Sequence, residues 1–217
     1  MTASVIAFDV NETLSDLSPL AARFVAVGAP AHQADLWFAS VLRDGFALTV
    51  AGESRPFAEI ARERLDITLG PEAVDPVMDG FLELSTHPDV TPGLRALHDA
   101  GFRLVTLSNG SASIAERLLS DAGVADAFES FLSVDDAGWW KPDRRAYEYA
   151  AKACGVDLSD MLMVAVHPWD IDGAARAGME TAYVDRSARR YPATFTAPTY
   201  TVTGIDALAE TLEHDPR

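Results

Sequence analysis

The stretch Ala3-Ser4-Val5-Ile6-Ala7-Phe8-Asp9-Val10-Asn11-Glu12-Thr13 decides the fold of this chain. Its first half is a short apolar run, which is typical of a strand buried on both faces of a parallel sheet. The run ends at Asp9, so the sequence predicts a carboxylate at the C-terminal end of that strand. Ligands of open α/β sheets bind at this edge, which makes Asp9 a candidate functional residue.

Three further apolar runs have the same character and lie at residues 103–107, 162–166 and 181–184. The first two end at the polar clusters Ser108-Asn109-Gly110 and His167-Pro168-Trp169-Asp170. Helical patterns alternate with these runs, and a glycine follows each of them as a left-handed cap: 114–122 with Gly123, 144–154 with Gly155, and 170–177 with Gly178. This alternation predicts a doubly wound α/β sheet whose polar strand ends meet along one edge.

Residues 16–89 interrupt the alternation, because they contain helical patterns and no convincing buried strand. The segment follows the first predicted strand, which places it over the strand ends as a helical cap. We therefore predict an α/β core domain formed by residues 1–15 and 90–217, and a cap domain formed by residues 16–89. The apolar cap helices could also support a homodimer.

The charge balance of the 217 residues narrows the range of partners. The chain has 17 Lys and Arg residues against 33 Asp and Glu residues, which gives a net charge of −16. A field of this sign repels phosphate backbones and anionic lipid, so nucleic acid and membrane surfaces are not expected partners. The sequence begins without a basic leader, has no apolar run long enough to span a membrane, and has a single cysteine. We expect a cytoplasmic protein without a disulfide.

A nucleophilic role for Asp9 follows from ordinary carboxylate chemistry. A carboxylate at a strand end is ionised at neutral pH and can attack an electrophilic centre. The ammonium group of Lys141 would keep it ionised and attract an anionic substrate. Thr13 could orient one oxygen of Asp9, while Ser108, Asn109 and the backbone N–H groups that start the following helix could hold a carboxylate or phosphate.

Four segments together resemble the haloacid dehalogenase superfamily, in their order and spacing, over essentially the whole chain. They are Asp9-Val10-Asn11-Glu12-Thr13, Ser108-Asn109-Gly110, Lys141-Pro142 and the strand-end Asp170. The resemblance implies a Rossmann-like core with a helical cap inserted after the first strand. It also implies a hydrolase with an aspartate nucleophile.

One branch of that superfamily consists of magnesium-dependent phosphatases, and this chain departs from it in two places. The phosphatases carry an acid two residues after the nucleophile, where this chain has Asn11. They also bring two acidic groups to the metal from the fourth strand end. Here Asp170 fits the later one, while Ala165 stands at the earlier one. A magnesium-dependent phosphatase that acts on a small metabolite stays an alternative, although Asp9 and Asp170 are the carboxylates left to bind Mg²⁺.

The first element looks more like that of the L-2-haloacid dehalogenases, which need no metal or other cofactor. The resemblance extends to Thr13, to Lys141-Pro142 followed by Tyr147, and to the cap in position and size. It implies that Asp9 displaces halide from the carbon next to the carboxylate of a small anionic substrate. A water near Asp170 and Lys141 would then hydrolyse the aspartyl ester. The candidate substrate-binding residues are Asn11, Phe38, Arg43, Ser108, Asn109, Tyr147 and Trp169.

Two departures from this branch leave the function open. The family's cap arginine corresponds to Phe38, for which Arg43 on the same helix is a candidate substitute or else a solvated charge. The family's Ser-x-Asn becomes Ala165-Val166-His167, and His167 could order or deprotonate the hydrolytic water. A non-catalytic binding protein with this fold is therefore a further alternative. Tryptophans are also concentrated in segments expected near the pocket, where they could bind halide or pack the cap: Trp37, Trp139, Trp140 and Trp169.

Overall fold

A six-stranded sheet in the order β3-β2-β1-β4-β5-β6 forms the centre of the computed structural model, which describes residues 3–188 and 190–214. Its strands are β1 (Val5–Phe8), β2 (Arg103–Ser108), β3 (Phe128–Ser133), β4 (Met161–Ala165), β5 (Glu180–Val184) and β6 (Tyr200–Val202). Each pair of neighbours is parallel, and β1 pairs with β2 and β4. The doubly wound α/β sheet predicted from the sequence is thereby confirmed.

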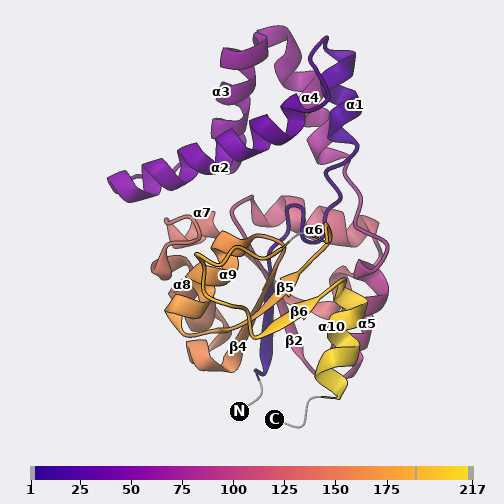
Figure 1. Cartoon of the computed structure of the whole chain (residues 1–217), viewed down its shortest axis with the longest axis vertical. Coiled ribbons are helices and arrows are strands. Elements are labelled where there is room, and N and C mark those ends of the chain that lie inside the picture. Colours follow the sequence, from indigo (N-terminus) through magenta and orange to yellow (C-terminus); the bar gives the residue numbers. More distant parts are fainter. Residues whose placement is uncertain (1–2, 189, 215–217) are drawn as a thin grey trace.

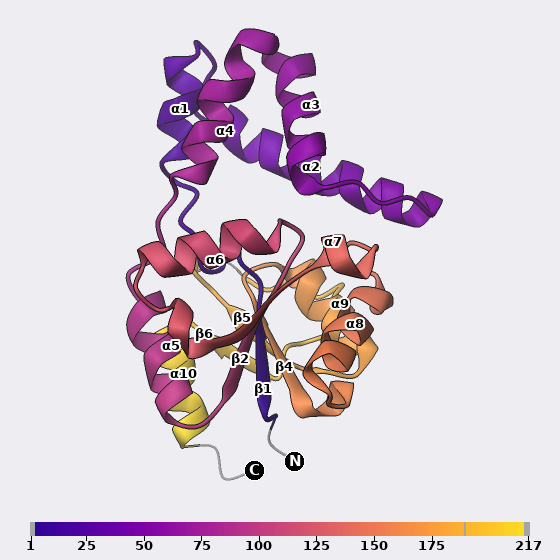
Figure 2. The same cartoon turned by 180° about the vertical axis from the view of Figure 1, so that it is seen from behind.

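Two helical layers cover the sheet, one on each face (Figures 1 and 2). Alternate side chains of each strand point to opposite faces. Ile6 and Phe8 thus pack with the layer that contains α5 (Val90–Asp99) and α10 (Ile205–Glu213). Val5 and Ala7 pack with α8 (Arg144–Cys154) and α9 (Pro168–Ala177). All four side chains are fully buried, which explains the uninterrupted apolar run in the sequence.

Further helical elements complete the connections around the sheet. They are α6 (Ala112–Asp121), η2 (Ala125–Ala127), α7 (Val134–Ala137) and η3 (Leu158–Asp160). The glycines predicted to end three helices adopt the left-handed conformation, with φ of 68° at Gly123 and Gly155 and 108° at Gly178. Strands β3 and β6 lack a counterpart among the predicted runs. Strand β3 is partly exposed and β6 is only three residues long, so neither forms a long buried apolar run.

Between β1 and α5 the chain forms a helical layer above the carboxyl ends of the strands (Figure 1). It consists of α1 (Leu20–Ala26), α2 (Gln33–Ala51), α3 (Phe57–Leu69), η1 (Pro71–Ala73) and α4 (Val74–Leu82). These helices, which we call the cap, have an apolar core of their own that includes Phe24, Trp37 and Phe81. Trp140, from the loop before α8, joins this cluster and so connects the cap to the core.

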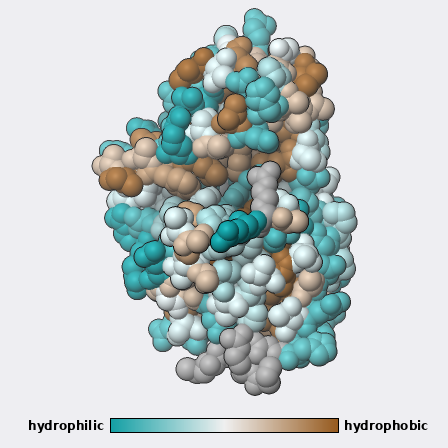
Figure 3. Space-filling view, in the orientation of Figure 1, coloured by the Kyte–Doolittle hydropathy of each residue, from teal (hydrophilic) through white to brown (hydrophobic). Residues whose placement is uncertain are grey.

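The C-terminal half of α2 projects beyond the rest of the cap and carries apolar groups on its surface (Figure 3). Val50, in this half, is 89% exposed. Among the residues that the structure describes, no helix combines the length and apolar character needed to cross a membrane.

Candidate active site

Asp9, Lys141 and Asp170 form a buried charged cluster at the carboxyl ends of β1 and β4. The Lys141 ammonium group donates to Asp9 Oδ1 at 3.0 Å and to Asp170 Oδ2 at 2.5 Å. Burial alone would lower the pKa of Lys141, but the nearby charges of Asp170 and Asp9 outweigh it and raise the pKa. Burial raises the pKa of Asp170, and the ammonium group opposes that shift. Lys141 therefore stays charged and bridges the two carboxylates.

Thr13 holds the second oxygen of Asp9. Its hydroxyl donates to Asp9 Oδ2 at 2.6 Å and accepts a hydrogen bond from the backbone N–H of Val166 at 3.1 Å. The backbone turns sharply after the strand, because the N–H groups of Leu14 and Ser15 both donate to the carbonyl of Val10. This turn brings Thr13 back toward Asp9. The carboxylate of Asp9 is thus held at both oxygens.

Tyr147 contacts the other carboxylate of the cluster. Its hydroxyl donates to Asp170 Oδ1 at 2.7 Å, and burial together with the charge of Asp170 raises the pKa of Tyr147 well above its ordinary value. Gly173 on α9 allows this approach, since a Cβ there would lie 2.6 Å from the Tyr147 hydroxyl oxygen. Both oxygens of Asp170 therefore have a partner within the protein.

Asn109 acts on Lys141 through the backbone. Its Oδ1 accepts from the Lys141 N–H at 2.9 Å, and its Nδ2 donates to the Lys141 carbonyl at 3.2 Å. The sequence predicts that this side chain receives the substrate carboxylate. In the structure its Oδ1 and Nδ2 instead bond the backbone of Lys141. Ser108 lies beside it, and its hydroxyl oxygen accepts from the Gly110 N–H at 2.9 Å.

His167 extends the site toward the cap. Its Nε2 lies 3.6 Å from Asp9 Oδ2 and 3.3 Å from the carbonyl oxygen of Asn11. The imidazole ring stacks on Trp169, with centroids 5.0 Å apart, and on Phe38 of α2, at 6.3 Å. Phe38, which stands where the resemblance leads us to expect an arginine, therefore faces the site as an aromatic group.

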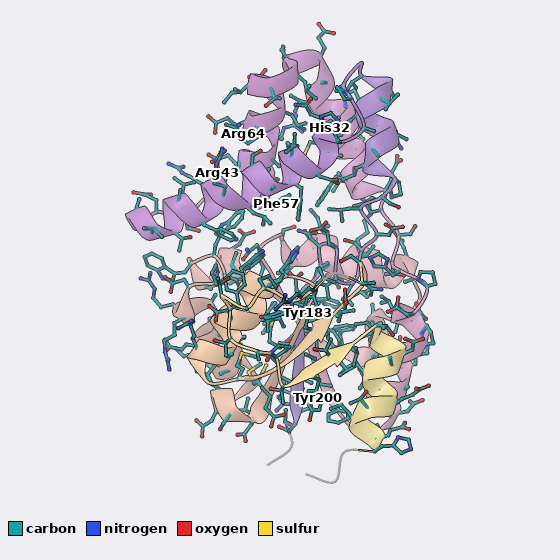
Figure 4. The ribbon with its side chains drawn as sticks, in the orientation of Figure 1. His32, Arg43, Phe57, Arg64, Tyr183 and Tyr200 are labelled. Carbon is teal, nitrogen blue, oxygen red and sulfur yellow. The ribbon has the colours of Figure 1, made fainter. Side chains whose placement is uncertain are left out.

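The structure does not bring Arg43 to this site. Its side chain is 63% exposed and its Nε donates to Asp44 at 2.8 Å (Figure 4). Five residues along an α-helix correspond to a rotation of about 140° from Phe38, so the two side chains leave α2 in different directions. Arg43 is thus a solvated charge of the cap.

Of the four tryptophans, Trp169 is the one that lies in the site, and the other three have packing roles. The indole N–H groups of Trp37 and Trp140 donate to carbonyl oxygens of the cap, those of Ala61 and Arg55. Trp139 lies under the guanidinium group of Arg145. The concentration of tryptophan in the sequence therefore reflects cap docking more than ligand binding.

Two site residues were missed in the sequence analysis. Glu12 lies in the turn after Asp9 with φ of 62°, and its Oε2 lies 3.5 Å from His167 Nε2. Arg186 donates to the carbonyl of Thr13 at 2.7 Å and pairs with Asp89. The position of Glu12, an acidic residue three positions after Asp9, was a signal already visible in the sequence. No local signal identifies Arg186, which is distant in sequence and meets the turn through the fold.

Cavities lie on both sides of the turn that follows Asp9, residues 10–15, which we call the nucleophile turn because of the role predicted for Asp9. One, of about 300 Å³, lies between α4 and α6 and is lined by residues that include Asn11, Ser113 and Ile114. Another, of about 280 Å³, lies under α2 and is lined by residues that include Glu12, Phe38 and His167. Asn11 thus borders the first cavity, next to the first turn of α6, while Glu12 and His167 border the second.

Comparison with known proteins is consistent with this geometry. A model of haloacid dehalogenase-like hydrolases matches residues 3–178. The chain is 30% identical to an (S)-2-haloacid dehalogenase of Pseudomonas sp. (strain YL), covering 96% of this chain and 94% of that one. It is also 30% identical to haloacetate dehalogenase H-2 of Moraxella sp. (strain B), covering 94% and 95%. A solved dehalogenase with an intermediate complex superimposes with a TM-score of 0.91 at 26% identity, covering 99% of each chain.

Proposed function

The chain belongs to the haloacid dehalogenase-like hydrolase family, and from this premise we propose that it hydrolyses the carbon–halogen bond of a small 2-haloalkanoic acid. The observation that carries the proposal is the fixed carboxylate of Asp9, held by Lys141 at one oxygen and by Thr13 at the other. A carboxylate held in this way is preorganised for attack. The relatives named as 2-haloacid dehalogenases support this substrate class.

The proposed reaction has two steps. An oxygen of Asp9 attacks the carbon that bears the halogen, and the halide leaves with the electron pair of the broken bond. Water then attacks the carbonyl carbon of the resulting Asp9 ester, which regenerates the carboxylate and releases the 2-hydroxy acid. The local donors for the anionic substrate are Lys141 and the backbone N–H groups at the start of α6.

The donor set at this site does not fit Mg²⁺, and we propose a reaction without a metal. The ammonium group of Lys141 is bonded to both Asp9 and Asp170, between the two carboxylates that a cation would need. Asn11 and Ala165 add no further carboxylate. A divalent cation requires several oxygen ligands and would be repelled by the adjacent ammonium group. This geometry favours dehalogenation over the phosphatase alternative.

A substrate screen tests the proposal. Chloroacetate, bromoacetate, fluoroacetate and both enantiomers of 2-chloropropionate are compared with a panel of phosphate esters, each with and without EDTA. Halide release that is unaffected by EDTA is the expected result. Phosphate release that EDTA abolishes and Mg²⁺ restores would overturn it. Ligand binding without turnover of any compound would instead indicate a non-catalytic binding protein with this fold.

A single turnover in oxygen-18 water tests the covalent step. The expected result is label in the peptide that contains Asp9, because water attacks the ester at the carbonyl carbon. Label found only in the 2-hydroxy acid would show direct displacement of halide by water and would exclude the ester.

A further inference from the structure

Glu12 is an acidic group beside the nucleophile that the scheme above leaves unused. Its φ of 62° lies in the left-handed region, which non-glycine residues adopt at a cost. Its side chain points to His167, with Oε2 3.5 Å from the imidazole Nε2, and is 42% exposed. A strained acid in the nucleophile turn calls for a functional explanation.

Asp170 is poorly placed to activate the hydrolytic water. Its two carboxylate oxygens accept hydrogen bonds from Lys141 Nζ and from the Tyr147 hydroxyl group, and its side chain is fully buried. Because the Asp170 side chain has no exposed surface, neither of its oxygens is open to a water molecule from the solvent. Asp170 therefore serves to hold Lys141 and Tyr147.

His167 presents a proton and not a lone pair to the nucleophile. Its Nε2 is surrounded by three acceptor oxygens: the carbonyl of Asn11 at 3.3 Å, Oε2 of Glu12 at 3.5 Å and Oδ2 of Asp9 at 3.6 Å. A ring nitrogen among acceptors carries hydrogen. His167 Nε2–H consequently donates to the carbonyl oxygen of Asn11, with the carboxylates of Glu12 and Asp9 beside it, and another group must accept the proton of water.

Solvent reaches the nucleophile turn from the side of Glu12 and His167. Both residues line the cavity of about 280 Å³ under α2. They also line a larger groove, of about 840 Å³, between the cap and the core. Oε2 of Glu12 and Oδ2 of Asp9 lie 3.5 Å and 3.6 Å from the same imidazole nitrogen, so the acidic group and the reacting carboxylate face the same ring atom.

We propose that Glu12 is the general base of ester hydrolysis, an inference that rests on the proposed function. The Glu12 carboxylate takes one proton from water as the water oxygen bonds to the carbonyl carbon of the Asp9 ester. The bond from that carbon to the product oxygen then breaks, and the product oxygen receives the proton from Glu12. The second proton of the water leaves the regenerated Asp9 carboxyl group to solvent. His167 Nε2–H stabilises the negative charge that develops on the Asp9 oxygen during the addition.

The charges around Glu12 suit this role. Burial raises the pKa of Glu12, the facing His167 lowers it, and the carboxylates of Asp9 and of Asp35 on α2 raise it further. His87 contacts Glu12 only at its backbone carbonyl, at 3.1 Å. A carboxylate with a raised pKa is a stronger base than an ordinary one.

The test measures the two steps separately in Glu12→Gln, with bromoacetate as the probe. Bromide release in the first turnover reports ester formation, and the mass of the Asp9 peptide reports the trapped ester. The variant should release about one bromide per protein at the wild-type rate and then accumulate ester, because hydrolysis slows by about 100-fold or more. The acid limb that the Glu12 pKa imposes on wild-type ester hydrolysis should disappear from its pH profile.

Two further variants complete the design. Glu12→Gly should accumulate ester in the same way and fold at least as stably as the wild type, because glycine adopts positive φ without strain. Asp66→Asn removes an exposed cap carboxylate on α3 that does not line this cavity, and it should leave ester hydrolysis within about threefold of the wild-type rate.

Each outcome is decisive for one of the two ideas. If Glu12→Gln hydrolyses the ester at the wild-type rate with an unchanged pH profile, Glu12 is not the base. If it loses the first-turnover bromide release as well, Glu12 acts before the ester forms and the proposal is again overturned. If the wild-type protein releases no halide from any haloacid, the proposed function fails, and the role of Glu12 fails with it.

Discussion

Asn109 holds Lys141 at both backbone polar groups, with its Oδ1 accepting from the N–H at 2.9 Å and its Nδ2 donating to the carbonyl at 3.2 Å. The side chain of Lys141 in turn bridges Asp9 and Asp170. The loop after β2 thereby fixes the position of Lys141, which lies in the loop between α7 and α8. Positioning of Lys141 is built into the backbone and does not depend on substrate.

Replacement of Asn109 should therefore reduce both activity and stability. Asn109→Ala leaves two buried backbone groups of Lys141 without partners, which should cost about 2 kcal/mol or more in the free energy of unfolding. Displacement of Lys141 should lower kcat for halide release about tenfold or more. Urea unfolding and a halide assay measure the two effects. Ser120→Ala, on the exposed surface near the end of α6, is the control and should change neither.

Removal of the lysine charge should be more severe. Lys141→Met leaves two buried carboxylates without a counterion, which should cost about 3–5 kcal/mol in the free energy of unfolding. The same change should abolish ester formation, because Asp9 loses the ammonium group that holds one of its carboxylate oxygens. Lys152→Met, on the exposed surface at the end of α8, should cost less than about 1 kcal/mol. Equal losses in the two variants would contradict a special role for Lys141.

The contact between Gly45 and Trp140 should control how the cap docks. A Cβ at Gly45 would lie 2.3 Å from the indole ring of Trp140, a residue that also donates to the cap carbonyl of Arg55. Gly45→Ala should therefore cost about 1–3 kcal/mol in the free energy of unfolding and lower kcat/KM. In the double variant with Trp140→Leu, the smaller side chain should absorb the methyl group, so the two losses should be less than additive. Simple additivity would mean that the clash is relieved elsewhere.

The pair formed by Asp89 and Arg186 should make stability depend on pH. Burial would raise the pKa of Asp89, but hydrogen bonds from Arg186 and from the Ile205 N–H outweigh it and lower the pKa. A lowered pKa in the folded state adds stability above the unfolded pKa of about 3.9, and that stability is lost as pH falls through the folded value.

Asp89→Asn isolates this contribution. The difference in unfolding free energy between wild type and variant should be constant above about pH 5 and should shrink as the pH falls toward about 3. Urea unfolding at a series of pH values measures it. A difference that stays constant over this range would show that the charge of Asp89 does not contribute to the pH dependence. Because Arg186 also donates to the carbonyl of Thr13, the variant should in addition loosen the nucleophile turn.

The sequence by itself was sufficient for the central strands and for the meeting of their polar ends. Buried parallel strands form continuous apolar runs, and parallel strands place their carboxyl ends at one edge whatever the packing above them. Asp9, Ser108, Asn109 and Asp170 could therefore be placed together, while the family resemblance added Lys141 to them and Thr13 could be assigned to an oxygen of Asp9. Edge strands β3 and β6 lack such runs, since they are partly exposed or short.

Only the tertiary structure decided what each polar side chain contacts. Arg43 and Phe38 leave α2 in different directions, and the orientation of α2 turns Arg43 away from the site. The loop after β2 turns the side chain of Asn109 toward the backbone of Lys141. Glu12 became a candidate base only when the fold brought His167 close to both Glu12 and Asp9. Spacing along a chain determines which edge of the sheet a residue occupies, because strand and helix periodicities are regular. Contacts across that edge depend on helix rotation and loop path, which long-range packing sets.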